Sequence, residues 1–319
     1  MSNGTVLVTG GAGFIGSHLC ERLLRSGSAV VCLDNFNKSY DPLIKRRNLE
    51  FCLRCSNFKL IEGDILDSGL ADSIMLDSKP DAVVHLAALA GVRNSIAAPL
   101  DYVDTDIKGT VAMLEACKRH GTRKFIFASS SSVYGTAPTP FREDATLADQ
   151  VSPYAAAKYS GEMFCRIYSR LYGISSVCLR FFTVYGPRQR PDMAVHMFTR
   201  AIIEGRKISI YGDGSSSRDY TYIDDIIDGI MSAITLPCTF EVFNLGNSSA
   251  VGILELVSVI ENKLGRKASL SFIPDQPGDV PATFADIKKS EAMLGFKPKV
   301  PLDEGISRFA DWFLKTGRA

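Results

Sequence analysis

The chain has 319 residues, 46% of them hydrophobic and 22% charged, and its formal net charge is +1. This composition excludes disordered, collagen-like and coiled-coil classes, and the balanced charge lacks the basic excess of a nucleic-acid-binding protein. No apolar run reaches the roughly 18 residues that a membrane-spanning helix needs, and no basic segment precedes the first predicted strand, so we expect no membrane segment, no signal peptide and a cytoplasmic location.

Short apolar runs alternate with helical patterns over the first part of the chain. They predict strands over residues 5–8, 29–33, 58–62, 82–86, 124–128 and 175–179, and helices over 14–26, 102–120 and 153–172. Strands that are apolar throughout are buried on both faces, and alternation of strand and helix is typical of a parallel sheet covered on both sides. We therefore predict an α/β fold with a doubly wound parallel sheet of the Rossmann type.

The regular pattern weakens after Arg180. Prolines and the Gly/Ser loop 212–217 interrupt it, although residues 223–234, 252–264 and 302–315 still predict helices. At about 150 residues per domain, the length suggests two lobes. We expect residues 1–180 to form a dinucleotide-binding domain to which segments around 219–247 return, and residues 181–319 to form mainly a smaller, interleaved substrate lobe.

The eight cysteines are scattered along the chain, most of them in apolar contexts. Free cysteine packs as a small hydrophobic residue, so we expect reduced, buried thiols. Cys52 and Cys55 have the spacing of half a zinc site, but no second pair follows them, and we predict no metal.

A glycine-rich turn follows the first predicted strand, with Gly10, Gly13 and Gly16 evenly spaced. In a dinucleotide fold these glycines allow a tight turn, a close approach of backbone to pyrophosphate, and packing of helix on strand. The N–H groups at the start of that helix favour phosphate binding. Asp34 ends the second strand, where a carboxylate hydrogen-bonds the adenosine ribose and repels a 2′-phosphate. The pattern therefore predicts NAD rather than NADP.

Further cofactor contacts are expected where the next strands end. Asp64 would neighbour the adenine, and residues 85–88 would pass under the cofactor, with His85 structural rather than catalytic. The predicted cofactor set also contains Phe14, Ile15, Asn35, Asn37, Lys38, Ile65, Leu86, Ala87, Ala88, Tyr154, Lys158 and Phe181.

Tyr154 and Lys158 are candidate catalytic residues because they lie one turn apart on a predicted helix and share one face. A cation beside a phenol favours the phenolate, so the pair can supply a general base near neutral pH. The preceding strand ends in the serine run 129–132, at the sheet edge where ligands bind in such folds. A hydroxyl there can bridge the substrate and Tyr154.

Together these motifs resemble the extended short-chain dehydrogenase/reductases of the nucleotide-sugar epimerase/dehydratase group, over essentially the whole chain. The matching segments are TGGAGFIGSH, SSSSVYG, Tyr154-x-x-x-Lys158, Arg218-Asp219-Tyr220 and Tyr222-Ile223-Asp224-Asp225. The resemblance implies tightly held NAD that is recycled in each turnover, and a homodimer built on a four-helix bundle from helices 102–120 and 153–172. By position, Ser130 matches the family's catalytic Ser/Thr, with Ser131 close behind.

The residues after Ser130 discriminate between members of the family. Similar sugar 4,6-dehydratases have Asp-Glu before the Val-Tyr-Gly segment, and UDP-glucuronate decarboxylases have a Glu just before it, whereas this chain has Ser131 and Ser132. Dehydration therefore lacks its extra acid and base, and decarboxylation is disfavoured more weakly. Epimerisation at the sugar C4 remains.

The segment 180–194 resembles UDP-glucuronate 4-epimerases, because Thr183 stands where UDP-galactose 4-epimerases have Asn and because RPDMA follows. An arginine can bind a carboxylate bidentately, and a neutral hexose offers no such partner, so Arg190 is the candidate carboxylate ligand. The other substrate contacts that the resemblance implies are Ser130, Ser132, Thr183, Ala194, Val195, Ser209, Ile210, Tyr211, Arg218 and Asp279.

The chain departs from its relatives at two places. Asp275 and Gln276 stand where galactose epimerases carry arginines, which shifts the expected diphosphate binding towards Arg218. Asp106 stands where many relatives have Asn, and the sequence assigns no role to the added charge.

The resulting hypothesis is interconversion of UDP-glucuronate and UDP-galacturonate. Tyr154 would take the 4-OH proton while C4 passes its hydrogen to NAD as hydride, and the 4-keto sugar would turn over before the hydride returns to its other face. A pocket that holds the carboxylate would prevent loss of CO2 from this β-keto acid. The alternatives are a UDP-glucose or UDP-N-acetylhexosamine 4-epimerase, then a UDP-glucuronate decarboxylase, and, outside the enzymes, an NAD-binding regulator.

Overall fold

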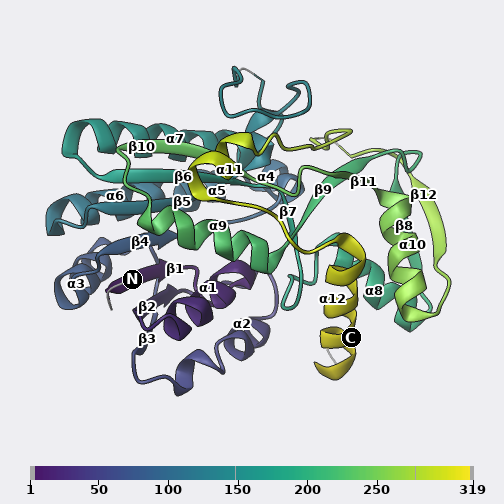
Figure 1. The fold of residues 1–319 in the computed structure, drawn as a ribbon, viewed down its shortest axis with the longest axis horizontal. Coiled ribbons are helices and arrows are strands. Elements are labelled where there is room, and N and C mark those ends of the chain that lie inside the picture. The colour runs from purple at the N-terminus through teal and green to yellow at the C-terminus, as the bar shows by residue number, and fades with distance from the viewer. Residues whose placement is uncertain (1–3, 148, 277, 317–319) are drawn as a thin grey trace.

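The computed structural model describes residues 4–147, 149–276 and 278–316 (Figure 1). Its strands are β1 (Thr5–Thr9), β2 (Ala29–Asp34), β3 (Phe58–Glu62), β4 (Ala82–His85), β5 (Lys124–Ser130), β6 (Ser175–Phe181), β7 (Thr183–Tyr185), β8 (Lys207–Tyr211), β9 (Ser217–Tyr222), β10 (Phe240–Leu245), β11 (Ala250–Gly252) and β12 (Ser269–Ile273). Its α-helices are α1 (Phe14–Arg25), α2 (Pro42–Asn48), α3 (Ser68–Ser78), α4 (Val92–Ala97), α5 (Pro99–Tyr102), α6 (Gly109–His120), α7 (Pro153–Tyr172), α8 (Ala194–Glu204), α9 (Ile223–Thr235), α10 (Ile253–Leu264), α11 (Lys288–Leu294) and α12 (Leu302–Thr316). Two 3-10 turns, η1 (Cys52–Arg54) and η3 (Ser131–Tyr134), and one π-helical turn, η2 (Val103–Lys108), complete them.

The larger lobe is built on a parallel sheet. Within the described residues it has seven strands in the order β10-β6-β5-β4-β1-β2-β3. β1 pairs with both β2 and β4, so the chain changes direction across β1 and the loops after β1 and β4 part there. Ligands bind at such a switch point, outside the carboxyl ends of the strands. The predicted doubly wound α/β fold is confirmed.

Apolar residues of each strand pack alternately on the two faces of this sheet. Val6 and Val8 pack in the core with α1 and α9, whereas Leu7 between them packs in the core with α3, α6 and α7. Successive strand side chains point to opposite faces, so a run of three apolar residues serves both cores. Figure 1 shows α1 and α9 together on one side of the sheet.

The sheet ends in a strand from late in the chain. β10 pairs with β6 from Phe240 opposite Ser176 to Leu245 opposite Phe181, after the chain has passed through β7, α8 and β8. The smaller lobe, on the right of Figure 1, holds the parallel pair β8–β12 and the helices α8, α10 and α12. The two lobes are therefore interleaved along the sequence.

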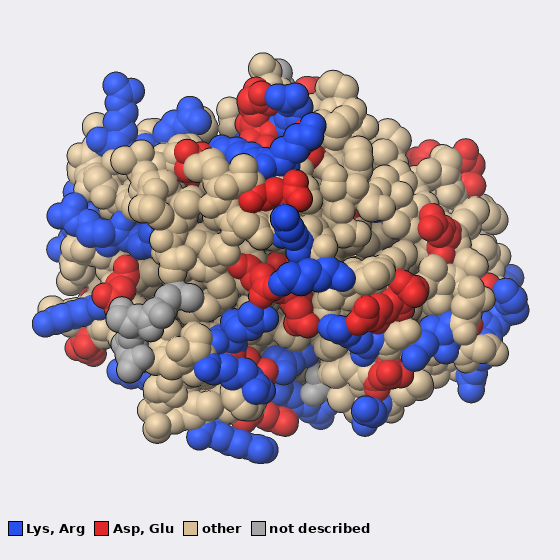
Figure 2. Space-filling model, viewed as in Figure 1, with Lys and Arg blue, Asp and Glu red and all other residues tan. Residues whose placement is uncertain are grey.

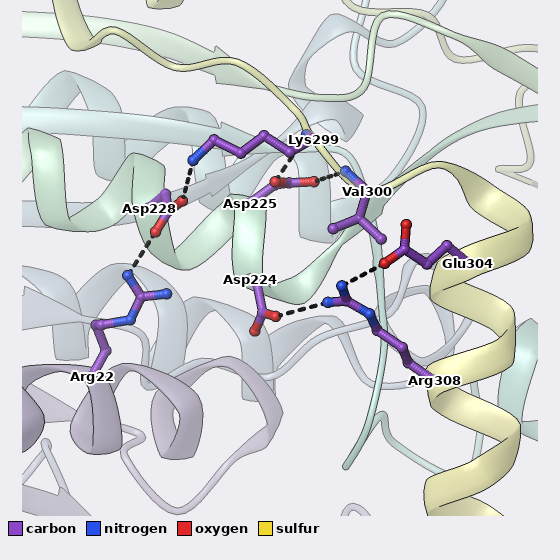
Figure 3. Close-up of polar contacts among 8 residues, drawn as sticks. All are labelled: Arg22, Asp224, Asp225, Asp228, Lys299, Val300, Glu304 and Arg308. Carbon is purple, nitrogen blue, oxygen red and sulfur yellow. Dashed lines mark hydrogen bonds and ion pairs between the residues drawn. The ribbon is translucent and has the colours of Figure 1, made fainter.

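The acidic start of α9 holds the lobes together (Figure 3). Asp225 accepts the backbone N–H groups of Lys299 at 3.0 Å and Val300 at 3.2 Å, on the segment that leads into α12. Asp228, one turn later, pairs with Arg22 of α1 at 2.7 Å. The helix after the glycine loop and the segment before α12 are thus fixed to one helix.

The predicted helix over residues 102–120 is confirmed, because the chain is helical without a break from Pro99 to His120, but a π-helical turn that was not predicted lies within it. α5 ends at Tyr102, and the π-helical turn η2 separates it from α6. A π turn inserts one residue and shifts the side chains that follow, and such turns are frequent at functional sites. Here the turn buries Asp106, which is 1% exposed.

Acidic and basic side chains are interspersed on the face drawn in Figure 2. Opposite charges in close alternation produce no extended basic field on that face. None of the helices in the described residues is long and apolar enough to span a bilayer.

Candidate active site

A cavity of about 270 Å³ opens at the carboxyl ends of the sheet strands. The predicted residues that line it are Gly10, Gly13, Phe14, Ile15, Gly16, Asp34, Asn35, Asn37, Ile65, Leu86, Ala87, Ala88, Ser130, Tyr154, Lys158, Phe181 and Arg190. The structure therefore brings the glycine turn, the Tyr-Lys pair and the candidate carboxylate ligand to one place.

The glycine turn is shaped for close backbone approach. Gly10 has a φ of +69° and its N–H donates to the Leu33 carbonyl at 2.7 Å. A Cβ at Gly10 would lie 2.7 Å from the Ala87 nitrogen, and one at Gly16 would collide with the Gly10 carbonyl oxygen. Glycine at these positions therefore lets the turn fold tightly against the start of α1 and the residues after β4, as in the phosphate-binding turn of a dinucleotide fold.

Asp34 is a buried carboxylate at the end of β2, 6% exposed. Its oxygens accept the N–H groups of Ala12 at 3.0 Å and Phe36 at 2.8 Å, so it fixes the glycine turn and the loop after β2 together. Asp64 lies outside the cavity lining and accepts the amide N–H of Asn35 at 2.8 Å. The end of β2 is therefore preformed and carries a carboxylate on the cavity lining, a position that fits the adenosine ribose of NAD.

Tyr154 and Lys158 face the cavity from the first turns of α7. Pro153 begins this helix, and Ser152 caps it by accepting the Ala155 N–H at 3.2 Å. The Lys158 Nζ lies 5.8 Å from the centre of the Tyr154 ring and is almost fully buried. A buried ammonium this close stabilises a phenolate, which is the chemistry of a general base.

A buried ion pair fixes α7 against the sheet one turn beyond Lys158. Glu162 accepts the Ser129 hydroxyl at 2.5 Å and the Arg180 Nε at 2.9 Å, and all three side chains are buried. Removing one partner of such a pair costs about 3–5 kcal/mol, so the helix has one firm position. Ser130 lines the cavity beside this anchor, and its Oγ lies 2.6 Å from the Ser132 Oγ.

Arg190 reaches the cavity from the loop after β7. Its Nε donates to Asp192 at 3.0 Å, and its Nη2 approaches the Ala90 carbonyl at 3.4 Å. Burial alone would lower the pKa of Arg190, but the ion pair with Asp192 raises it above the ordinary value. Arg190 therefore lines the cavity as a charged side chain that is paired with Asp192.

Residues expected at the nucleotide end form a second cluster outside the cavity lining. The guanidinium of Arg93 lies 3.9 Å above the Tyr211 ring and pairs with Asp279 at 2.7 Å. Arg218 donates to the Ser217 carbonyl at 2.8 Å, and burial lowers its pKa while Asp279 opposes that shift. Arg93 was not predicted from the sequence, because a lone arginine in a short helix carries no motif.

Several other predicted residues lie beyond the cavity lining: Lys38, Ser131, Ser132, Thr183, Ala194, Val195, Ser209 and Ile210. The lining also contains residues that were not predicted, among them Tyr40, Lys45, Thr105, Phe182 and Met193. Phe182 flanks Thr183 and Met193 flanks Ala194, so a wider window around these two positions would have found them. The described residues bring together no group of three His, Cys, Asp or Glu side chains suited to a metal ion.

Comparison with known proteins shows which protein family this chain belongs to. The NAD dependent epimerase/dehydratase family matches residues 6–246. The chain belongs to this family. It is 40% identical to UDP-glucuronate 4-epimerase of Thermodesulfobacterium geofontis, over 97% of this chain and 96% of that protein.

Two solved structures of relatives superpose closely on this epimerase/dehydratase chain. UDP-glucuronic acid 4-epimerase from Bacillus cereus, in complex with UDP-glucuronic acid and NAD, has a TM-score of 0.93 and 40% identity, covering 98% of this chain and 99% of that one. UDP-glucose 4-epimerase of Thermotoga maritima, with UDP-glucose, has a TM-score of 0.91 and 34% identity with the same coverage. The family membership confirms the predictions of an NAD-dependent enzyme of this class and of NAD as cofactor.

Proposed function

We propose that the chain is a UDP-sugar 4-epimerase that interconverts UDP-glucuronate and UDP-galacturonate. The observation that carries this proposal is Arg190, a charged guanidinium that lines the same cavity as Tyr154 and Lys158. A uronic acid offers this cation a carboxylate, and a neutral hexose does not. The two UDP-glucuronate 4-epimerases described above, each 40% identical to this chain, support the same choice.

The chain's own residues account for binding and proton transfer. The glycine turn and Asp34 would hold NAD, which when bound supplies oxidation and re-reduction at the sugar C4. Tyr154 takes the proton of the 4-OH and returns it after the 4-keto sugar has turned over, and Lys158 stabilises the phenolate. Ser130 offers a hydroxyl to the same oxygen. Each proton removed by Tyr154 is returned by it, so the protein ends each turnover unchanged.

Retention of the carboxylate is the second task of the site. The 4-keto uronate is a β-keto acid, which loses CO2 when its C5–carboxylate bond stands perpendicular to the carbonyl plane. Arg190 would hold the carboxylate away from that geometry. Ser131 and Ser132 supply no additional acid or base for decarboxylation or dehydration.

A neutral UDP-hexose is the second candidate substrate. Arg190 is held in a fork by Asp192, with Nε on one carboxylate oxygen and Nη2 on the other, so its charge has a partner before any substrate arrives. A neutral sugar could therefore bind in this site without leaving the Arg190 guanidinium unpaired. The Thermotoga maritima UDP-glucose 4-epimerase, 34% identical, supports this alternative.

The test is a panel of UDP-sugars with the products identified by NMR, followed by Arg190→Ala. Loss of one partner from a buried charge pair costs about 2–5 kcal/mol, so kcat/KM for UDP-glucuronate should fall at least ~30-fold while a neutral UDP-hexose loses little. The variant should also release CO2 and form a UDP-4-keto-pentose, visible by mass spectrometry. Tyr154→Phe, inactive on every sugar with NAD retained, is the control.

A second variant, Asp192→Asn, distinguishes UDP-glucuronate from a neutral UDP-hexose by removing the carboxylate that pairs with Arg190. Without the competing carboxylate the guanidinium is free, so KM for UDP-glucuronate should fall while KM for a neutral UDP-hexose stays unchanged. Equal losses on acidic and neutral sugars in Arg190→Ala, or a preference of the wild type for a neutral sugar, would reject UDP-glucuronate as the substrate.

A further inference from the structure

A second carboxylate lies beside Lys158 that the reaction described above does not use. Oδ2 of Asp106 is 3.6 Å from the Lys158 Nζ, and both side chains are buried. Among the described residues this oxygen has no hydrogen-bond partner, whereas Oδ1 accepts the N–H of Leu89 at 2.7 Å. One oxygen is therefore anchored, and the other lies next to the ammonium that assists Tyr154.

The π-helical turn η2 places Asp106 beside Lys158. The residue lies in the middle of the π-helical turn η2, and Thr105 beside it lines the active-site cavity. The Thr110 hydroxyl donates to the Asp106 carbonyl at 2.6 Å and stabilises the turn. An asparagine would accept the Leu89 N–H equally well through its amide oxygen. The negative charge is thus additional to what the turn needs.

We propose that Asp106 is a positioning residue whose carboxylate opposes the charge of Lys158 and so sets the pH at which Tyr154 releases its proton. A phenolate gains stability from a nearby cation, and an anion on the far side of that cation reduces the gain. Burial raises the pKa of Asp106, and the nearby Lys158 ammonium counteracts part of that shift. This role concerns proton transfer common to all UDP-sugars and does not depend on which sugar is bound.

The other titratable groups around this pair do not duplicate the effect. Burial lowers the pKa of His85, on β4, to about 3, and burial raises that of Tyr102, on α5, to about 12, so both are neutral near pH 7. Arg190 and Asp192, on the loop after β7, form an ion pair of their own. Replacing Asp106 by Asn changes the charge beside Lys158 and leaves these groups in place.

The test is the pH dependence of Asp106→Asn in the NAD-loaded protein. The acid limb of the kcat profile, where activity rises as Tyr154 loses its proton, should move to lower pH by about one unit, with the plateau within a few-fold of wild type. A second readout needs no turnover: the tyrosinate absorbance titration of each protein, minus that of its Tyr154→Phe counterpart, should move in the same direction. This second curve is independent of the choice of sugar, so an error in the proposed substrate leaves it interpretable.

Asp104→Asn is the matched control. Asp104 lies on the same turn, is exposed, and faces Lys108 at 3.9 Å, so its substitution should leave both curves in place. If Asp106→Asn folds and both curves coincide with those of the wild type, or if Asp104→Asn moves them as far, Asp106 has no such role. Should Asp106→Asn not fold, Asp106→Ser, which keeps an acceptor for the Leu89 N–H, takes its place in the same titration.

Discussion

At the scale of single residues, His85 ends a central strand below the cavity, where acid–base chemistry would be natural. Its ring is instead held in the core, by a 2.8 Å hydrogen bond between Nδ1 and the Thr9 hydroxyl and a 3.2 Å bond between Nε2 and the Thr110 hydroxyl. Burial lowers the pKa of His85 from 6.5 to about 3. A ring that stays neutral throughout the working pH range stabilises the fold and carries no proton for the reaction.

This depressed pKa predicts a specific pH dependence of stability. The unfolded chain protonates His85 near pH 6.5, and the folded chain only near pH 3. Above pH 6.5 both states hold a neutral ring and His85 causes no loss of stability. As the pH falls from 6.5 towards 3, only the unfolded state gains the proton, so the free energy of unfolding decreases. In His85→Gln the free energy of unfolding should therefore depend less steeply on pH between 6 and 4, by about 1.4 kcal/mol per pH unit. Urea unfolding at several pH values measures this slope. An unchanged slope, or loss of turnover in a stably folded variant, would contradict the structural role.

At the scale of elements, the start of α9 separates a buried contact from an exposed one (Figure 3). Asp225→Ala would remove a buried carboxylate that accepts two part-buried backbone N–H groups of the segment before α12, and losing a hydrogen bond to a charged group costs roughly 1.5–3 kcal/mol. Asp224→Ala breaks the 3.5 Å ion pair with Arg308, whose partners are about half exposed, and should cost only about 0–1 kcal/mol. Thermal unfolding of the two neighbouring variants gives the comparison. Similar losses in both would show that Asp225 does not hold α12.

Elements with a local signal were predictable, and elements fixed by distant contacts were not. The strands β1 to β6 were found because each carries a short cluster of apolar residues between helical patterns, and Gly10, Asp34, Tyr154 and Lys158 were selected because of their spacing and their place after predicted strands. The strand β10 and the π-helical turn were missed. β10 is a strand because β6 offers it a partner, and the inserted residue of the turn leaves the apolar periodicity on either side intact.

Residues of the candidate site likewise divide into those with a local sequence motif and those placed by distant contacts. Tyr40 and Lys45 line the cavity although no motif contains them, because the loop after β2 is folded back by Asp34. The ion pair of Arg93 with Asp279 joins residues from distant parts of the chain. Such contacts depend on how the two lobes meet, which spacing along a sequence does not record.

At the scale of the whole molecule, exposed apolar side chains gather on α5, the π-helical turn and α7. Leu100 is 75% exposed, Val103 47%, Ile167 46% and Leu171 64%. Large apolar patches on a protein surface mark interaction sites, and the family resemblance implies a helical dimer at these helices. We therefore predict a dimer in solution.

Light scattering after gel filtration tests the dimer. The wild type should have twice the chain mass, and Leu171→Glu should have the mass of one chain because a charge buried in the interface loses its hydration. Leu76→Glu is the matched control, since Leu76 is 61% exposed on α3, away from the patch. A monomeric wild type, or a dimer that survives Leu171→Glu, would place the contact elsewhere.

The late arrival of β10 in the sheet has a consequence for how the protein is made. During synthesis β6 emerges with one side unpaired, and its partner follows only after the whole stretch from β7 to α9 has left the ribosome. An unpaired strand edge is a template for aggregation, so the nascent chain passes through a vulnerable interval just before completion of its largest sheet. Messages that end within this stretch would yield insoluble protein even though the glycine turn, Tyr154 and Lys158 are all present. The candidate catalytic residues Tyr154 and Lys158 are thus synthesised well before the strand that completes the sheet.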